Sequence, residues 1–493
     1  MKRKELKEKK QNRGITLIAL IITIIVLLIL AGVTINLTLG ENGIFKTAEN
    51  AGKNYTQAEQ EELEGLANFE NTINNIIGGT GNSTPVGTGS LTPGKRYDQD
   101  TDLTIGDYKI TIPGGATISG ISGEYENIDK GIVIYIIPEN ETPDWTAKDE
   151  NGVYEIQKEY DQFVWVPVKN AILDLSGNAT ALASDTSIKA AVQSEIDAGR
   201  YPMAIKKDAT NYIGVLYEFE DATDEEENHY VKVTPYSGWT PTSTNSGTNS
   251  GNREPDVVTS YDNNTSYLDQ INGILNTSYN NSTSFKTALQ TDFNTMVTRV
   301  DEKEGFWVGR YETSKMSNST TTTYAESNKI QVGVKRGTTE GINKVTWYRM
   351  YAQQKIYKEK ALTESENITS SMIWGSQWDQ IMIWMKEVEN EAKSSYYVIN
   401  SLTKGNYGTS DDEDESTAEP AATGNSENYK VKNVFDLAGN VRDWTLEAND
   451  TSYRVDRGGY CDGTHTSYTR ADNRNDYYPY YSNSYDGSRS TLY

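Results

Sequence analysis

The chain of 493 residues contains very little cysteine and histidine. Cys461 is the single cysteine, which excludes an internal disulfide framework and any zinc site built from several thiolates. His229 and His465 are the only histidines, so catalysis by paired imidazoles is poorly supported. Asp and Glu outnumber Lys and Arg by 70 to 46, and the resulting net charge of -24 argues against nucleic acid as a partner. Tyrosine, in contrast, is abundant at 33 residues.

The N-terminus carries a membrane-anchor pattern. Residues 1–14 form a basic leader, and residues 15–35 follow as an apolar run without any charge. As a helix, this run spans about 31 Å, which matches the hydrocarbon core of a bilayer. Because the basic flank stays cytoplasmic, we expect a cell-membrane protein with a single pass and an extracellular head.

The order of a basic segment, Gly14 and an apolar helix starting at Ile15 resembles the leader of type IV prepilins. The resemblance implies that a membrane peptidase cuts between these two residues, and that pilus subunits join the membrane as partners. Ala19 departs from the pattern, because pilins usually carry a glutamate there. A plain signal anchor and a cleaved secretory signal stay open as alternatives.

The rest of the chain divides by composition. The apolar helix and an Ala/Glu-rich stalk extend over 15–77, and a Gly/Ser/Thr/Pro-rich flexible linker follows at 78–95. A small β region at 96–156 leads into a head at 157–493. Within the head, FVWVPV predicts a strand, whereas residues 239–284 indicate long surface loops with one possible helix inside them.

Two amphipathic helices complete the prediction, and the fold class is therefore α+β. The apolar spacing of KVTWYRMYAQQKIYKEKAL and SQWDQIMIWMKEVENEAK is typical of helices that face a core. Several large side chains of this region are predicted to be buried: Trp374, Trp378, Ile381, Ile383 and Trp384.

Eight short motifs follow one another along the head: FVWVPV, GFWVGRYETS, KVTWYRMYA, WGSQWDQIMIWM, NVFDLAGNVRDWT, RGGY, a pair of arginines at 470 and 474, and DGSR at 486–489. In this order they resemble the formylglycine-generating-enzyme-like (sulfatase-modifying factor) family. The resemblance covers about 330 residues and implies a C-type lectin-like head.

The resemblance also bears on chemistry. Oxygenases of this family hold copper with two cysteines just after RGG, whereas this chain has Cys461 alone. We therefore expect no enzyme activity and no required cofactor, with a formylglycine-generating oxidase as the remote alternative. Lectin-fold members often hold calcium at the GNVxxW turn, so the matching Asn440, Val441 and Asp443 become candidates for a structural calcium site. Arg442 replaces the usual tryptophan of that turn.

The region 460–489 resembles the variable region of proteins that are diversified by retroelements. It is rich in Tyr, Asn, Ser and Asp, which antibody loops use because tyrosine offers stiff contact area and the small polar residues offer adaptable hydrogen bonds. The predicted ligand-binding residues are Tyr460, Asp462, His465, Tyr468, Asp472, Asn473, Asn475, Asp476, Tyr477, Tyr478, Tyr480, Tyr481, Asn483, Tyr485 and Asp486.

Two functional classes follow from these patterns. The first is a surface-displayed adhesin or receptor-type protein that binds an extracellular macromolecule or cell-surface ligand through 460–489. The second is a structural minor pilin or pseudopilin, whose head packs in a filament. An irregular polar strand with incidental tyrosines is the simpler interpretation of the tail.

The leader generates the first prediction. If the prepilin resemblance holds, N-terminal sequencing of the protein extracted from membranes yields a chain that starts at Ile15. A chain that still starts at Met1 would reduce the N-terminus to a plain anchor.

Overall fold

The computed structural model describes residues 91–224, 229–242, 255–315, 332–337, 345–386, 397–401, 404–407, 419–461, 469–482 and 484–493. None of the helices in these ranges is long and apolar enough to cross a membrane. The leader with Gly14 and Ile15, the apolar run and most of the linker lie outside the described residues, so the anchor stays a prediction. Residues 86–493 form one compact unit.

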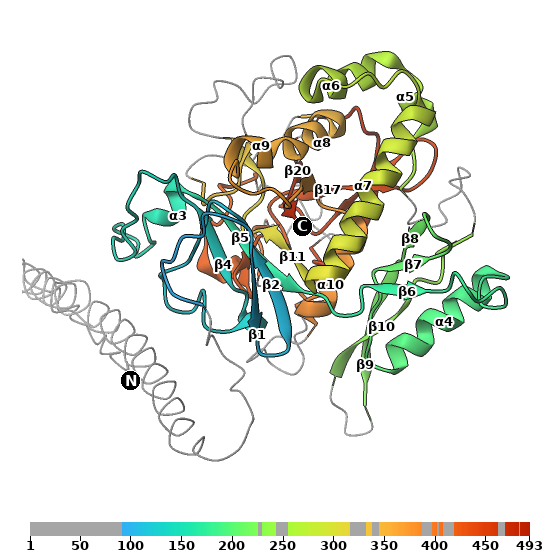
Figure 1. Cartoon of the computed structure of the whole chain (residues 1–493), viewed down its shortest axis with the longest axis horizontal. Helices are drawn as coiled ribbons and strands as arrows, with labels where there is room; N and C mark the ends of the chain where they lie inside the picture. The colour runs from blue at the N-terminus through green and yellow to red at the C-terminus, as the bar shows by residue number, and fades with distance from the viewer. Residues whose placement is uncertain are drawn as a thin grey trace, which may run out of the picture. The chain divides into compact units, whose positions relative to one another are not determined.

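An antiparallel sheet of six strands lies at the centre of this unit (Figure 1). Its order is β14-β21-β11-β5-β4-β3, with bounds Ser370–Met372, Ser490–Leu492, Gly305–Gly309, Asp161–Pro167, Val133–Ile136 and Ala116–Ile118. The predicted strand FVWVPV is therefore confirmed as β5. The last strand of the chain, β21, lies between β14 and β11, so the C-terminus ends inside the head.

A second sheet of four strands, in the order β19-β18-β17-β20, is built largely by the C-terminal region. Its strands are Arg474–Tyr477, Arg454–Arg457, Arg442–Ala448 and Asp486–Ser488. The β17–β20 pair is parallel, and the other two pairs are antiparallel.

A long insertion separates β5 from β11. It contains a three-stranded sheet of β6, β7 and β8 (Ile172–Asp174, Ala204–Lys206, Tyr212–Gly214) and the hairpin β9–β10 (Tyr217–Thr223, His229–Pro235). Its helices are α4 (Asp185–Asp197), α5 (Thr259–Asp262), α6 (Thr265–Leu275) and α7 (Ser282–Lys303). Figure 1 shows α4 beside the hairpin and α7 running along the central sheet.

The remaining elements are short. They are β1 (Thr101–Ile105), β2 (Tyr108–Ile112), η1 (Ile128–Lys130), α3 (Ile156–Glu159), β12 (Ser314–Lys315), β13 (Val332–Gly333), α8 (Trp347–Lys355), α9 (Tyr357–Ala361), α10 (Gly375–Met385), η3 (Glu427–Tyr429), β15 (Lys430–Val431) and β16 (Val434–Phe435). Mixed helices and several sheets confirm the α+β class.

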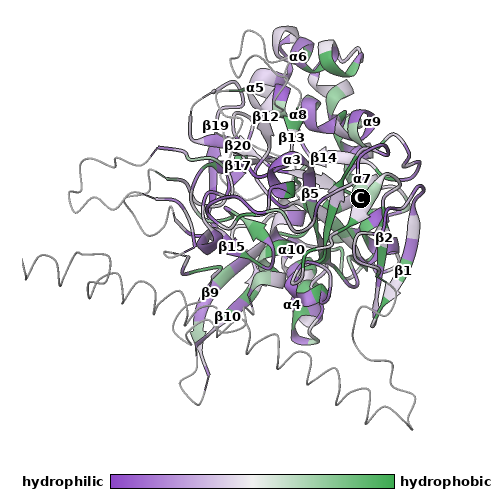
Figure 2. Ribbon diagram, turned by 90° about the vertical axis from the view of Figure 1, so that its left-hand side faces the viewer, coloured by the Kyte–Doolittle hydropathy of each residue, from purple (hydrophilic) through white to green (hydrophobic). Residues whose placement is uncertain are grey.

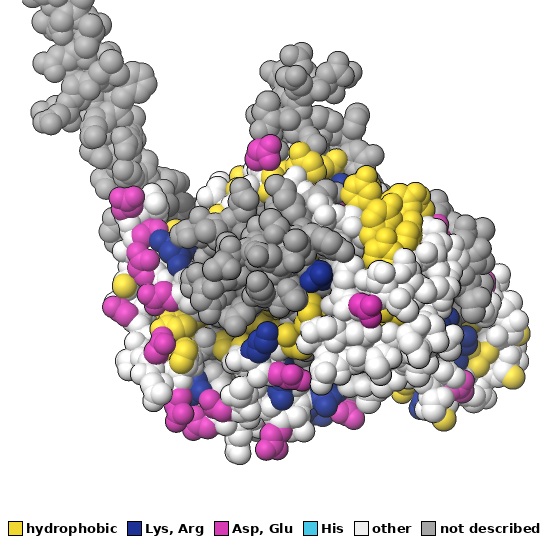
Figure 3. Space-filling model, turned by 90° about the horizontal axis from the view of Figure 1, so that it is seen from above, with side chains coloured by type: hydrophobic (Ala, Val, Ile, Leu, Met, Phe, Trp, Pro, Cys, Tyr) yellow, Lys and Arg dark blue, Asp and Glu magenta, His cyan; other side chains and the backbone are white. Residues whose placement is uncertain are grey.

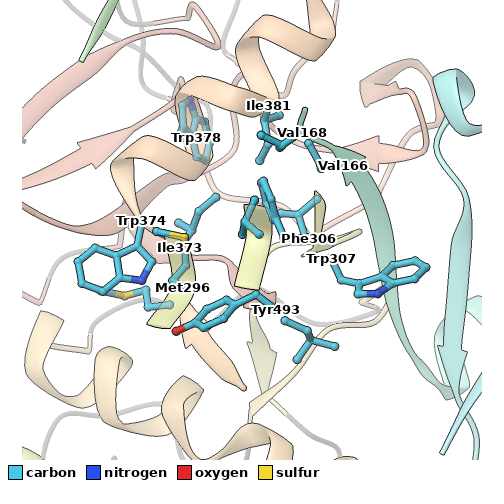
Figure 4. Packing of buried hydrophobic residues seen from close by; sticks show 14 of the residues in the cluster. Val166, Val168, Met296, Phe306, Trp307, Ile373, Trp374, Trp378, Ile381 and Tyr493 are labelled. Atoms are coloured by element: carbon cyan, nitrogen blue, oxygen red, sulfur yellow. The ribbon is translucent and has the colours of Figure 1, made fainter. Parts of the chain in front are cut away.

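The core joins the central sheet to α7 and α10. Figure 4 shows Phe306 from β11, Val166 from β5 and Ile381 from α10 together in one packed cluster, with the C-terminal Tyr493 close by. Figure 2 shows hydrophobic residues concentrated around β5 and α10. Trp374, Trp378 and Ile381 are buried as predicted, and Ile383 and Trp384 are partly buried.

Helix α7 is the main element that the sequence analysis did not predict. The sequence predicts long surface loops with one helix inside them over 239–284, and α6 is such a helix. Helix α7, however, begins within this range at Ser282, behind Asn281, whose side chain accepts a hydrogen bond from the Ser284 N–H. Its buried residues recur at steps of three and four: Phe285, Leu289, Phe293, Met296, Val297 and Val300. Frequent threonines in this segment lower helix propensity and hid the pattern.

A buried ion pair ties the insertion to the C-terminal sheet. Arg454 of β18 donates to Asp262 of α5 over 2.8 Å, and both side chains are fully buried. The same carboxylate accepts from the Tyr348 hydroxyl at 2.8 Å, while the guanidinium lies 4.1 Å from the centre of the Trp347 ring. Because one charge would stay buried without its partner, neither residue can change alone without a large loss of stability.

Replacement of this arginine by methionine tests the pair. We expect Arg454→Met to lower the free energy of unfolding by about 3–5 kcal/mol, measured by urea denaturation. The double variant Arg454→Met/Asp262→Asn should regain part of that loss. The solvent-exposed pair between Lys303 and Asp102 is the control: Lys303→Met should cost less than about 1 kcal/mol. Equal losses for the two single variants would contradict the account.

Candidate functional site

The region 460–489 is held to the scaffold at both ends. Near its start, Gly458 has φ +82°, and a Cβ there would lie 2.7 Å from the Leu437 carbonyl oxygen, so only glycine fits. At its end, Arg489 is fully buried, donates to the Asp443 carboxylate over 3.0 Å and also donates to the carbonyls of Gly309 and Phe435. These contacts fix where the region leaves the sheet and where it returns.

The structure places eleven of the fifteen predicted ligand-binding residues. Asp462, His465, Tyr468 and Asn483 lie outside the described residues. Tyr481 is exposed at 40%, and Asp486 is buried at 1%. The other nine are half-buried: Tyr460, Asp472, Asn473, Asn475, Asp476, Tyr477, Tyr478, Tyr480 and Tyr485. The region is therefore a partly packed surface, and Asp486 lies beneath it rather than on it.

Four tail tyrosines pack against one another. Tyr477 and Tyr481 meet edge to face with their ring centres 4.7 Å apart, and Tyr478 stacks on Tyr480 at 5.4 Å. Such aromatic pairs add about 0.5–1.5 kcal/mol beyond the area that they bury. The Pro479 carbonyl between them accepts a hydrogen bond from the Trp347 N–H at 3.1 Å, which fastens the turn to α8.

Three further tyrosines join the same group, and none was predicted from the sequence. Tyr261 of α5 lies 5.0 Å from Tyr480, and Tyr267 of α6 lies 6.1 Å from Tyr480. Tyr453 donates its hydroxyl to that of Tyr478 over 2.8 Å. We call these seven residues the tyrosine cluster: Tyr261, Tyr267, Tyr453, Tyr477, Tyr478, Tyr480 and Tyr481. No local pattern in the sequence links Tyr261 and Tyr267 to the tail, because they lie more than 200 positions before Tyr480.

Two hydroxyls of the cluster, those of Tyr261 and Tyr453, stay protonated at neutral pH. Burial raises the pKa of Tyr261 to about 12, with the neighbouring Tyr480 adding to the effect. The hydrogen bond to Tyr478 raises the pKa of Tyr453 to about 12. These phenols can therefore both donate and accept hydrogen bonds. Figure 3, seen from the side where α5 and α6 lie, shows a contiguous patch of hydrophobic side chains, a class that includes tyrosine in this figure.

Arg442 lies below the tail rather than on an open surface. Its guanidinium is 4.2 Å from the centre of the Tyr460 ring, a cation–π contact. Asp456 and Asp486 lie 3.8 and 3.9 Å from its nitrogens. Burial lowers the pKa of Arg442, but the two carboxylates outweigh burial and the pKa is raised overall. Arg442 is thus a charged residue that packs beneath the Tyr460 ring.

The side-chain oxygens of two proposed calcium ligands, Asn440 and Asp443, accept hydrogen bonds from protein donors. The Asn440 side-chain oxygen accepts from the Ala421 N–H at 2.8 Å, and Asp443 accepts from Arg489, a cation that opposes a metal ion. Val441 directs its N–H to Glu312 over 3.2 Å. Burial raises the pKa of Asp443 to about 6. Within the described ranges no three His, Cys, Asp or Glu side chains converge on a metal position. These residues therefore do not fit a calcium site, and we assign no role to calcium.

Cys461 is fully buried, and its N–H donates to the Asn440 carbonyl at 3.0 Å. The chain holds no second cysteine with which it could bind copper.

Comparison with known proteins gives only partial similarities. No protein-family model matches the sequence, and no curated protein matches it either. PvdO from Pseudomonas aeruginosa is similar over 38% of this chain and 81% of its own length, at 14% identity and a TM-score of 0.24. Treponema denticola variable protein 1 is similar over 38% of this chain and 95% of its own length, at 12% identity and a TM-score of 0.25. These low scores carry no argument about function.

Packing within the tyrosine cluster predicts a graded response to truncation. Tyr480→Ala, which removes contacts to several rings, should lower the free energy of unfolding by about 1–2 kcal/mol. Tyr481→Ala should cost less than about 1 kcal/mol because its side chain is exposed. Tyr230→Ala is the matched control: this tyrosine of β10 is 46% exposed, so its truncation should also cost less than about 1 kcal/mol.

Chemical denaturation of the three variants measures these losses. Truncation of an aromatic residue in the core lowers the free energy of unfolding by about 3 kcal/mol or more. Both tail variants would show such a loss if the tail were core. That result would show the tail to be part of the core rather than a surface.

Proposed function

We propose that the protein is a non-catalytic, surface-displayed ligand-binding protein with a C-type lectin-like head, and that 460–489 is its diversified binding face. The observation that carries the proposal is the tyrosine cluster. Four tyrosines of a tail that is tied to the scaffold at both ends pack ring against ring with each other and with three tyrosines from other parts of the head, while most of the seven keep part of their surface open.

This arrangement suits recognition for two reasons. First, rings that are already ordered lose little side-chain entropy when a partner binds, so more of the contact energy becomes affinity. Second, the residues that hold the face are distinct from those that form it. Arg489, Arg457 and Pro479 are buried, whereas the tyrosines lie above them. Exchange of surface residues can therefore leave the frame intact.

The remaining parts of the proposal rest on the sequence. The order of the eight motifs supports the C-type lectin-like head, and the lone cysteine supports the absence of oxygenase chemistry. The basic leader and the apolar run support display at the cell membrane or in a surface pilus. The partner is an extracellular macromolecule or cell-surface ligand.

A binding assay with matched tyrosine variants tests the proposal. The purified full chain is applied to arrays of extracellular proteins and glycans, and the dissociation constant of any specific partner is measured. Tyr478→Ala should weaken binding by about 2 kcal/mol, or roughly 30-fold, as expected for an aromatic anchor. Tyr230→Ala, an exposed tyrosine outside the cluster, should leave binding unchanged. A partner whose affinity ignores Tyr478 but depends on Tyr230 would refute this binding face.

A further inference from the structure

A polar cleft of about 580 Å³ lies between the insertion and the C-terminal sheet. One wall is formed by Leu216 and the β9 residues from Tyr217 to Asp221, among them Glu218 and Glu220. The other wall carries Arg457, Arg470, Asp472 and Arg474. Its volume falls in the range of sites that bind small molecules or short peptides. None of the seven residues of the tyrosine cluster lines it, so the cleft is a second candidate site.

The outer edge of β9 has no neighbouring strand among the described residues. In the β9–β10 hairpin, Tyr217 pairs with Pro235, which has no N–H, and the Tyr236 N–H donates to the Leu216 carbonyl. This pattern marks the Tyr217–Pro235 pair as one without hydrogen bonds between its two members. Alternate residues of β9 therefore direct their backbone groups away from β10.

The groups on this outer edge are consistent with that alternation. The Tyr217 N–H donates to Asp379 at 3.2 Å, and the Phe219 carbonyl accepts from Arg470 at 3.3 Å. The N–H groups of Phe219 and Asp221 point the same way, and neither has a partner within the described part of the chain. An unpaired strand edge is a template for another extended chain.

The opposite wall is rich in hydrogen-bond donors. Arg457 is 2% exposed and pairs with Asp379 through one nitrogen, but its Nε has no hydrogen-bond partner among the described residues. Burial lowers the pKa of Arg457, and the nearby Arg474 lowers it further. A carboxylate beside Arg474, whose side chain keeps 19% of its surface exposed, would offset the repulsion between the two guanidinium groups.

We propose that this cleft binds an extended peptide segment of another protein that carries an acidic side chain. The peptide backbone pairs with the outer edge of β9 at Phe219 and Asp221, and its carboxylate lies against Arg457 and Arg474. The hydrogen bond from the partly exposed Arg470 to the Phe219 carbonyl breaks when the peptide strand binds. The site does not depend on the proposed role of the tyrosine cluster.

Fluorescence polarisation of the full chain with a labelled pentapeptide, Thr-Val-Glu-Val-Thr blocked at both ends, tests the proposal. We expect saturable binding that weakens about tenfold or more when the peptide glutamate becomes glutamine. An analogue N-methylated at its central amides should not bind, because it cannot pair with a strand edge.

Two proline variants locate the site on the protein. Asp221→Pro removes an outward N–H within the cleft and should abolish binding. Thr223→Pro changes the same edge beyond the cleft and should not, since edge strands tolerate proline. Tyr478→Ala should bind the peptide normally, which separates this site from the tyrosine cluster. Binding that survives N-methylation or Asp221→Pro, that ignores the glutamate, or that is absent at millimolar peptide refutes the proposal.

Discussion

The buried ion pair between Arg489 and Asp443 is the interaction on which the C-terminal part of the molecule depends. It joins the tail to β17, and the same guanidinium donates to the carbonyls of the last residues of β11 and β16. Directly after it, β21 enters the central sheet between two other strands. Figure 1 accordingly shows the C-terminus in the middle of the head. The described part of the chain between Arg457 and Arg489 is therefore pinned at both ends, and it contributes β19 and β20 to the four-stranded sheet.

This constraint explains why the tail can be nearly free of aliphatic residues. The core is filled by other elements, such as β5, β11 and α10, and by the last two residues of the chain. Between its anchors the tail contributes aromatic rings that pack on each other and on the insertion. The insertion thus has two effects: it buries the salt bridge between Asp262 and Arg454, and it supplies Tyr261 and Tyr267 to the same surface.

Much of the frame could be predicted from the sequence, because it depends on local patterns. The short run of β-branched and aromatic residues in FVWVPV revealed β5, and helical spacing revealed α8 and α10. The motifs RGGY and DGSR contain Gly458 and Arg489, and the structure shows that these two residues hold the ends of the tail. The insertion was harder. Helix α7 is rich in threonine, and the contacts of Tyr261 and Tyr267 with the tail join residues about 200 positions apart. The predicted calcium ligands illustrate a second limit of sequence reasoning. Only the three-dimensional structure shows that the Asp443 carboxylate pairs with the Arg489 guanidinium.

The central claim is that 460–489 is a diversified face on a fixed scaffold, and sequencing of the DNA around the gene tests it most directly. The account predicts a reverse transcriptase gene nearby and a near-copy of the codons for the last 40 or so residues. Differences between the two copies should fall at adenines of the copy, in codons for the tyrosine-rich positions, while the codons for Arg457, Pro479 and Arg489 match. A locus with pilus assembly genes and no such copy would contradict the claim.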